Sequence, residues 1–545
     1  MRCFIGRATV LALGMIVCAG AAGWTTPSLQ SLPSLLSLNL TAPAARPNFL
    51  LIMADDMGYS DAGCYGGEIA TPNLDALAES GLRYSQFYST GRCWPSRASI
   101  LTGYYAQQVR RDKFPDTKLG NRPDWAPLLP VYLKEAGYRS YHSGKWHLDG
   151  EPLENGFDRS YSLHDQDRFF SPETHFLDGE ALPQPDRESG YYATRAIADH
   201  AVETLQEHAK NHADAPFFHY LAFTAPHFPL HALQEDIAKY RERYLEGWDA
   251  IRQARWQRLK ELGLVDSPLS DLDPEIIPPH NLPASELASR IGDGEAPQAV
   301  PWATLTDTQR AFQAHKMAIH AAMVDRMDQE VGRVLAQLKS MGAFENTVIF
   351  FVSDNGASAE QIIRADGHER DALPGSAASY LCLGPGFSSA ANTPFRLHKT
   401  WTHEGGIASP LIVHWPRGLV ARGEIRHQIG HFIDIVPTIL EMAAVPRNPF
   451  PGAPEAPGRS LVPSFLADNS VRHPYLWWHH DGRSAIRDGN WKLVSREDGN
   501  WALYFMETDR TEMEDRFSTH YDEAERLRKL WEAAAARFKA QAAGK

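Results

Sequence analysis

The plainest evidence for the fold is the segment Asn48-Phe49-Leu50-Leu51-Ile52-Met53-Ala54-Asp55-Asp56. Its apolar run, residues 48–54, is uninterrupted, which predicts a β-strand buried on both faces. Similar runs occur at residues 139–143, 217–223, 347–353 and 410–415, and helical patterns lie between them, notably at 191–210 and 307–341. This alternation predicts an α/β fold with a large, mixed, mostly parallel sheet flanked by helices.

The pattern changes near residue 470. Short strands are predicted at 475–479, 484–487 and 491–495, with Asp-Gly turns between them, and a charged helix at 521–542. We therefore expect a small C-terminal α+β subdomain. The predicted division is a signal peptide (1–23), a linker (24–46), a large domain (47–468, with an insertion at about 231–306 that carries a charged helix around 240–262) and the C-terminal subdomain (469–545).

The N-terminus resembles an export signal. Arg2 and Arg7 precede an apolar run at 10–17, and small residues follow at 19–23. We expect a periplasmic or secreted protein with no integral membrane segment once the signal is removed, because the run is short for a bilayer span. One alternative is that the segment is retained as a membrane anchor. Lipid attachment at Cys18 is a weaker alternative, because Val17 is a poor neighbour for lipoprotein processing.

Composition limits the classes of function. A hydrophobic content of 43% with 22% charged residues is globular, and a net charge of −13 argues against nucleic acid as a partner. Removal of the signal leaves Cys64, Cys93 and Cys382. Three cysteines are too few to form a disulfide framework in a chain of this length. At most Cys64 and Cys382 could pair, so Cys93 stands out as an odd cysteine in an exported protein.

Cys93 lies in Gly91-Arg92-Cys93-Trp94-Pro95-Ser96-Arg97, just before a helix-like run at 98–102. Amides at a helix start favour an anion, and the fork of donors on Arg97 suits a tetrahedral oxyanion. A cysteine there would be electrostatically activated. The alternative is a small buried cysteine beside ordinary helix capping. The pattern favours a nucleophile beside an oxyanion site.

Polar groups also follow the predicted strands. Asp55-Asp56 follows one predicted strand, and Asp354-Asn355 follows another. In open α/β sheets, ligands bind outside the carboxyl ends of the strands, where these residues stand. These four residues offer hard oxygen ligands, which suit calcium or magnesium and not zinc. A single aspartate after a strand is commonly a cap or a turn former, but two adjacent pairs favour a metal.

Cationic and proton-transferring groups complete the set. Lys145 and His147 follow the strand near residue 140, His227 follows the strand at 217–223, and Lys399 precedes Glu404-Gly405-Gly406. Each alone could be a surface lysine or a satisfied histidine. Together with Arg97 and a metal they predict a pocket for a group with several anionic oxygens, and sulfate and phosphate esters both fit.

Two motifs carry a family resemblance. Residues 93–97 with Leu101-Thr102-Gly103, and Gly144-Lys145-Trp146-His147-Leu148, resemble the signatures of type I sulfatases of the alkaline phosphatase superfamily, and bacterial arylsulfatases in particular. The resemblance covers about residues 47–515 and includes the Glu404-Gly405-Gly406 motif and a segment at 244–263. Asp149 stands where the family usually has glycine, and Ala408 where many members have arginine.

The resemblance implies an alkaline phosphatase-like fold and oxidation of Cys93 to formylglycine (3-oxoalanine) by a formylglycine-generating enzyme. One hydroxyl of its hydrate attacks sulfur, and the other then expels sulfate. The implied Ca²⁺ ligands are Asp55, Asp56, Asp354, Asn355 and the modified residue 93. Arg97 would steady that residue. Lys145, His227 and Lys399 would bind sulfate oxygens, one of them protonating the leaving group, and His147 would handle a proton at the diol.

The resemblance thus implies a sulfatase for aryl sulfates or sulfated saccharides. A phosphonate monoester or phosphodiester hydrolase shares the modified cysteine and the metal ligands and stays open as an alternative. A glycan-binding protein with an inactive site is a third reading, which the complete set of polar residues argues against. A conventional cysteine phosphatase is disfavoured, because its arginine stands farther from the cysteine than Arg97 does.

Overall fold

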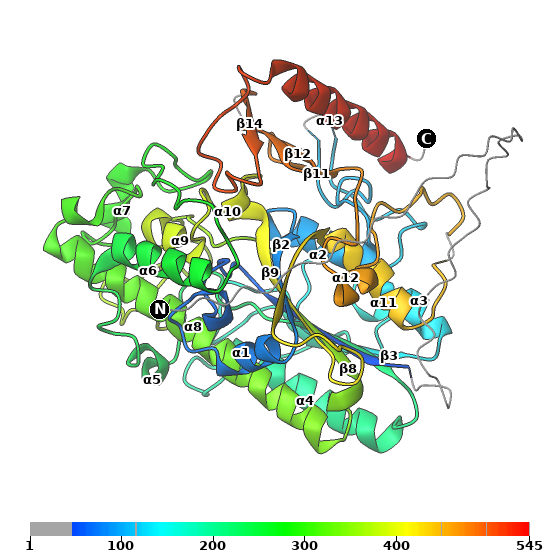
Figure 1. The fold of residues 1–545 in the computed structure, drawn as a ribbon. Helices are drawn as coiled ribbons and strands as arrows, with labels where there is room; N and C mark the ends of the chain where they lie inside the picture. Colours follow the sequence, from blue (N-terminus) through cyan, green and yellow to red (C-terminus); the bar gives the residue numbers. More distant parts are fainter. Residues whose placement is uncertain (1–45, 115–116, 448–449, 497–498, 544–545) are drawn as a thin grey trace, which may run out of the picture. The chain divides into compact units, whose positions relative to one another are not determined.

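The structure is a computed structural model that describes residues 46–114, 117–447, 450–496 and 499–543 (Figure 1). The predicted signal peptide, and all but the last residue of the predicted linker, lie outside the described residues. Among the described helices, none is both long enough and apolar enough to cross a membrane.

The main sheet has ten strands in the order β10-β2-β9-β8-β1-β7-β3-β4-β5-β6. Strand β1 lies at the centre and pairs in parallel with β7 and β8, whereas β9 runs antiparallel to β8 and β2. The predicted mixed, mostly parallel sheet is confirmed. Its strands are β1 (Asn48–Ala54), β2 (Leu82–Tyr88), β3 (Arg139–Lys145), β4 (Arg159–Leu163), β5 (His175–Leu177), β6 (Glu180–Ala181), β7 (Phe217–Ala222), β8 (Thr347–Ser353), β9 (Ala408–His414) and β10 (Glu424–His431).

Helices cover both faces of this sheet (Figure 1). Side chains of β1 alternate between two hydrophobic clusters, with Leu50 and Ile52 in one and Phe49 and Leu51 in the other. The first cluster includes residues of α1 (Pro72–Glu79), α4 (Ala193–Asn211) and α8 (Asp307–Ser340). The second includes residues of α2 (Cys93–Thr102), α3 (Leu129–Glu135) and α11 (Ile435–Met442). The continuous apolar run of β1 is therefore explained by burial on two faces.

The insertion contains α5 (Gln234–Ile237), α6 (Gly247–Glu261) and α7 (Ala284–Arg290). The helix expected around 240–262 begins only at Gly247, because short turns occupy residues 239–246. Trp248 of this helix is a core residue: it is buried, and its ring centroid lies 4.7 Å from that of Trp302 and 5.5 Å from that of Phe387. The remaining short helices are α9 (Pro385–Ala391), α10 (Glu404–Ile407) and α12 (Val462–Leu466).

A second sheet of four antiparallel strands follows, in the order β11-β12-β13-β14. Helix α13 (Tyr521–Ala542) covers one face of it, with Trp477 stacked on Trp531 at 5.6 Å (Figure 1). The predicted C-terminal α+β region is confirmed in kind, although its fourth strand was not predicted. The strands are β11 (Leu476–His480), β12 (Arg483–Asp488), β13 (Trp491–Ser495) and β14 (Trp501–Phe505).

Buried ion pairs join this second sheet to the large sheet. The ammonium of Lys492 lies 2.9 Å from Glu404 Oε1 and 2.8 Å from Glu512 Oε1, and all three side chains are buried. Arg510 Nε lies 2.9 Å from the other Glu404 oxygen, which also accepts a hydrogen bond from Tyr88 at 3.0 Å. Tyr88 ends β2, so the network connects both sheets through the Glu404 carboxylate.

Replacement of Lys492 tests this connection. Lys492→Met should lower the free energy of unfolding by about 3–5 kcal/mol, because it leaves two carboxylates buried without their shared cation. Denaturant unfolding and the melting temperature would measure the loss. Lys529→Met, at an exposed position of α13, is the matched control and should change stability little. Equal stability of the two variants would contradict a role for the network.

Candidate active site

The site residues lie where the central strands of the large sheet end. Asp55 and Asp56 directly follow β1, and Asp354 and Asn355 directly follow β8. Because β1 and β8 are parallel with Ala54 opposite Ser353, the two pairs leave the sheet side by side. Lys145 is the last residue of β3. All of these side chains are buried.

Hydrogen bonds connect three of these four acidic and amide residues. Asn355 Nδ2 donates a hydrogen bond to Asp56 Oδ1 at 2.7 Å, and the Asp56 amide donates to Asp354 Oδ1 at 3.3 Å. Asp55 Oδ1 and Asn355 Oδ1 are buried and have no hydrogen-bond partner among the described residues. Leaving a buried acceptor unpaired is unfavourable, so these two oxygens are open to a cation.

His227 lies beside this group. Ligand atoms of Asp55, Asp56 and His227 lie within 4.8 Å of one another, a spacing that could hold a metal ion. Its Nδ1 contacts the carbonyl of Phe228, which leaves Nε2 at 3.7 Å from Asp56 Oδ2. Burial and the cations Lys399 and Lys145 hold the pKa of His227 well below its usual range. The imidazole is therefore neutral here.

Each of the three carboxylates has a cationic partner. Arg97 Nη2 lies 2.8 Å from Asp354 Oδ2 and 3.5 Å from Asp55 Oδ2. Lys145 Nζ contacts Asp55 Oδ2, and Lys399 Nζ lies 2.8 Å from Asp56 Oδ2. Burial raises the pKa of Asp55, but Lys145 and Arg97 outweigh it, so the net shift is downward. Burial outweighs the cations at Asp56 and Asp354 and raises their pKa values, so the formal charges of the cluster balance when all three carboxylates are ionised.

Cys93 is the first residue of α2 and is 2% exposed. The sequence pattern placed the helix start after Arg97, but Pro95 fits within the first helical turn, so α2 begins at the cysteine itself. Arg92 precedes it in an extended conformation. Ser96 Oγ accepts a hydrogen bond from the Thr90 amide at 3.1 Å and so fixes the turn before the helix. Residue 93 therefore lies at the positive end of a helix dipole.

Arg97 is held on several sides. Its Nη1 donates to the Lys145 carbonyl at 2.9 Å and lies 3.4 Å from the Tyr220 hydroxyl, while Nε and Nη2 both contact Asp354. Arg97 is fully buried. A planar guanidinium with this many partners keeps one orientation, so Arg97 fixes the first turn of α2 against the ends of β3 and β8.

His147 lies in the loop after β3 with a left-handed φ of 55°. Its ring centroid is 5.7 Å from that of Trp94, and His480 of β11 approaches the same indole at 5.5 Å. His147 Nδ1 is buried and has no hydrogen-bond partner among the described residues. Burial, Lys145 and Arg97 hold the pKa of His147 well below its usual range, so this imidazole is neutral too.

Asp149, which stands where the family usually has glycine, holds the loop after His147. The Asp149 carboxylate accepts hydrogen bonds from the Arg122 amide and from Arg122 Nε, both at 2.8 Å. Arg111 lies 3.5 Å away. The following Gly150 takes the left-handed conformation, with a φ of 65°. Asp149 thus anchors this loop through arginine contacts.

Glu360 was missed by the sequence reading. It lies in the loop after β8, with Oε1 at 3.3 Å from Arg92 Nη1 and Oε2 at 3.6 Å from Lys399 Nζ. Burial raises the pKa of Glu360, but Arg92 and Lys399 outweigh it and lower it to about 2. Lys399 therefore has two carboxylate neighbours, Asp56 and Glu360. A glutamate six positions beyond Asp354 gives no pattern from which this contact could be predicted.

The glycines near Lys399 permit two loops to touch. A Cβ atom on Gly356 would lie 1.8 Å from the Gly405 carbonyl oxygen, and one on Gly406 would lie 2.1 Å from the Trp401 carbonyl oxygen. The Lys399 amide donates to the Ala357 carbonyl at 3.1 Å. The Gly-Gly motif therefore brings the loop that carries Lys399 against the loop that carries Asp354 and Asn355.

Comparison with known proteins agrees with this geometry. The family model described as Sulfatase matches residues 47–445. An uncharacterised sulfatase of Schizosaccharomyces pombe is 33% identical, over 91% of this chain and 94% of its own. The arylsulfatase of Klebsiella aerogenes is 31% identical, over 75% and 89%.

A solved structure of a protein with its substrate D-glucosamine-2-N,6-O-disulfate shares the fold. Its TM-score is 0.62 at 21% identity, and the match covers 91% of this chain and 98% of that one. The family match extends over most of the described chain, including every residue gathered at the strand ends. The chain belongs to the sulfatase family and is a sulfuric ester hydrolase.

Proposed function

We propose that this enzyme hydrolyses sulfate monoesters of aryl alcohols or saccharides through formylglycine at position 93 and a bound calcium ion. The observation that carries the proposal is the position of residue 93 at the start of α2, beside buried carboxylates with open oxygens and three buried cations. Residue 93 as formylglycine would supply a hydrated aldehyde whose hydroxyl attacks sulfur.

The donor set fits calcium. Asp55, Asp56, Asp354 and Asn355 present oxygen atoms and no sulfur, and calcium takes carboxylate and amide oxygens in flexible geometry. The unpartnered Asp55 Oδ1 and Asn355 Oδ1 are the acceptors that an ion would satisfy. Calcium, when bound there, would neutralise charge on the sulfate group and polarise the nucleophilic oxygen.

Two lysines and one neutral imidazole of the chain would surround the sulfate oxygens. Lys145 and Lys399 approach the cluster from β3 and from the Gly-Gly loop, and His227 approaches from the loop after β7. Lys145 or Lys399 would protonate the leaving oxygen, because His227 is neutral and its Nδ1 contacts the Phe228 carbonyl. Arg97, fixed by Asp354 and the Lys145 carbonyl, would hold residue 93 in position. His147, with its unpartnered Nδ1, would take a proton from the hydrate.

We also propose that the enzyme is exported and that it meets a formylglycine-generating enzyme before it reaches its final compartment. The basic and apolar pattern of residues 1–23 supports export. Cys93 is buried in the folded chain, which supports oxidation before folding is complete.

Substrate turnover tests the reaction class. Protein produced together with a formylglycine-generating enzyme should release sulfate from 4-nitrophenyl sulfate or from a panel of sulfated saccharides. It should act on the matching aryl phosphonate monoester with a lower kcat/KM. A preference for the phosphonate would favour the alternative reaction class, and no sulfate release from any ester would contradict the proposal.

The chemical state of residue 93 is a second test. Peptide mass spectrometry of active enzyme should show that Cys93 has lost its sulfur. Cys93→Ala should lower kcat by about 10³-fold or more, because no nucleophile remains. Cys64→Ala, at another buried free cysteine, is the matched control and should keep most of the activity. An unmodified thiol in fully active enzyme would exclude formylglycine as the nucleophile.

Removal of calcium is a third test. Dialysis against a chelator should abolish turnover and lower the melting temperature, and added Ca²⁺ should restore both. At a calcium concentration of 100 times Kd, the ion should add about 2.7 kcal/mol to the free energy of unfolding. Asn355→Ala should weaken binding in calorimetric titration, whereas the exposed Asp371→Asn should not. Equal calcium affinity in both variants would contradict the assigned ligands.

A further inference from the structure

Arg364 lies beside the cluster described above but is not part of it. It is exposed, in the loop after β8, and its guanidinium carbon lies 5.7 Å from the centroid of the Phe228 ring. Lys399 Nζ lies 5.1 Å from the centroid of the same ring, and Phe228 directly follows His227. Arg364 and Lys399 thus both approach one buried aromatic ring, which places the exposed cation close to a cation that would bind sulfate.

The charge of Arg364 has no direct partner. The guanidinium makes no hydrogen bond, and no ion pair within 4.0 Å, with any residue that the structure describes. Its charge lowers the pKa of Glu360 and of His227, which places it within electrostatic reach of the catalytic cluster. An exposed guanidinium without an ion-pair partner is a fork of donors open to a carboxylate or a sulfate.

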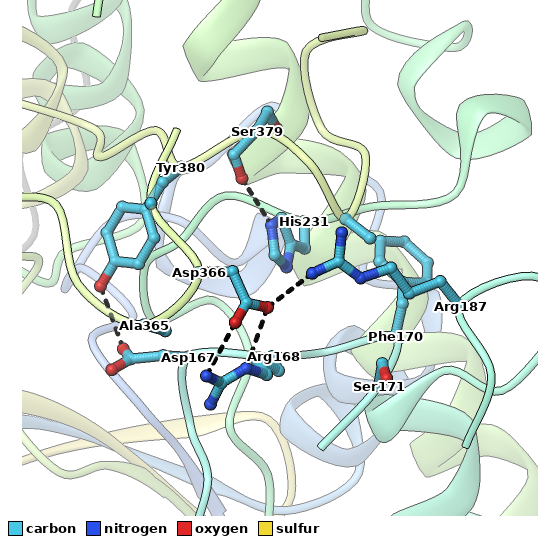
Figure 2. A pocket seen from close by; sticks show the side chains of 12 residues that line it. Asp167, Arg168, Phe170, Ser171, Arg187, His231, Ala365, Asp366, Ser379 and Tyr380 are labelled. Atoms are coloured by element: carbon cyan, nitrogen blue, oxygen red, sulfur yellow. Dashed lines mark hydrogen bonds and ion pairs between the residues drawn. The ribbon is translucent and has the colours of Figure 1, made fainter. Parts of the chain in front are cut away.

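The turn that carries Arg364 is held in place (Figure 2). Asp366 accepts from Arg168, with Oδ1 at 2.9 Å from Nη2 and Oδ2 at 3.0 Å from Nε, and from Arg187 Nη2 at 2.6 Å. The Gly367 amide donates to the Arg364 carbonyl at 3.0 Å and closes the turn. Two arginines distant in sequence therefore bind Asp366 and hold the turn from which Arg364 extends.

Asp167 and Tyr380 line the same pocket as Asp366 (Figure 2). The Tyr380 hydroxyl donates to Asp167 Oδ1 at 3.1 Å, and this is the one hydrogen bond to the Asp167 carboxylate found among the described residues. Arg364 and Lys145 both lower the pKa of Asp167, although burial raises it more. Asp167 Oδ2 accepts no hydrogen bond from any residue that the structure describes, so this oxygen is open to a ligand hydroxyl.

We propose that Arg364 is a specificity-determining residue that binds a second anionic group on the substrate. The group is a carboxylate or a further sulfate. It stands on the ring that carries the scissile sulfate ester or on the neighbouring ring. Asp167 would accept a hydrogen bond from a hydroxyl of the same substrate. The proposal rests on the proposed function. The buried residues would bind the sulfate group that every sulfate ester carries. Arg364 and Asp167 would add a preference for an acidic substrate with several hydroxyls.

Two matched substrate sets test this proposal. The first compares phenyl sulfate with 3-carboxyphenyl and 4-carboxyphenyl sulfate, and the second compares N-acetylglucosamine 6-sulfate with glucosamine-2-N,6-O-disulfate. Within at least one set, the wild-type enzyme should show the higher kcat/KM for the doubly anionic substrate. Arg364→Ala should lower this preference by about 10-fold or more, chiefly through KM, because it removes a charged hydrogen bond.

Two further variants complete the experiment. Arg364→Lys should keep part of the preference, and Arg370→Ala, at an exposed arginine in the same loop, should keep all of it. Equal kcat/KM within each set for the wild type, or a preference that survives Arg364→Ala, would overturn the proposal and leave the proposed function standing. Failure of the wild type to release sulfate from either set or from 4-nitrophenyl sulfate would instead overturn the proposed function, and this inference with it.

Discussion

The balance of buried charge at the ends of β1 and β8 is the constraint on which the structure depends. Asp55, Asp56 and Asp354 are removed from water, and burial of any of them alone would cost several kcal/mol. The sheet brings their cations to the same place: Lys145 at the end of β3, Arg97 on α2 and Lys399 on the Gly-Gly loop. A shift of one residue in the β1–β8 register would send these side chains to opposite faces. Strand register and charge balance therefore specify each other.

The sequence revealed the parts of the site that follow from local pattern. Buried strands are continuous apolar runs, so the strands before Asp55 and before Asp354 could be located and the polar pairs after them recognised. Strand direction was out of reach, because β9, buried on both faces, has the same apolar pattern whether it is parallel or antiparallel. Glu360 and Arg364 were missed for a similar reason. They lie in a loop without periodicity, and their neighbours Arg92 and Phe228 are distant in sequence.

The C-terminal sheet contributes to the surroundings of the nucleophile. His480 of β11 packs against Trp94, next to residue 93, and contacts Asp112 at 3.0 Å. Lys492 of β13 contacts Glu404, which directly precedes the two glycines that bring the Lys399 loop against β8. Both contacts are buried, so movement of the second sheet would disturb the loops on either side of the pocket. The small sheet therefore helps to set the position of the groups that surround residue 93.

Charge also indicates which esters the buried end of the pocket accepts. The three carboxylates are balanced by Arg97, Lys145 and Lys399, and Glu360 is paired with Arg92, while both histidines are neutral. A bound divalent ion would leave the equivalent of two positive charges. A sulfate monoester carries one negative charge and an ionised nucleophilic oxygen carries another, so the reacting site becomes neutral. A phosphate monoester dianion would add a third negative charge in a medium where unpaired charge is costly. With that ion bound, the inner residues would favour singly charged esters, and discrimination among these would fall to outer residues such as the exposed Arg364, which has no ion-pair partner in the described part of the chain.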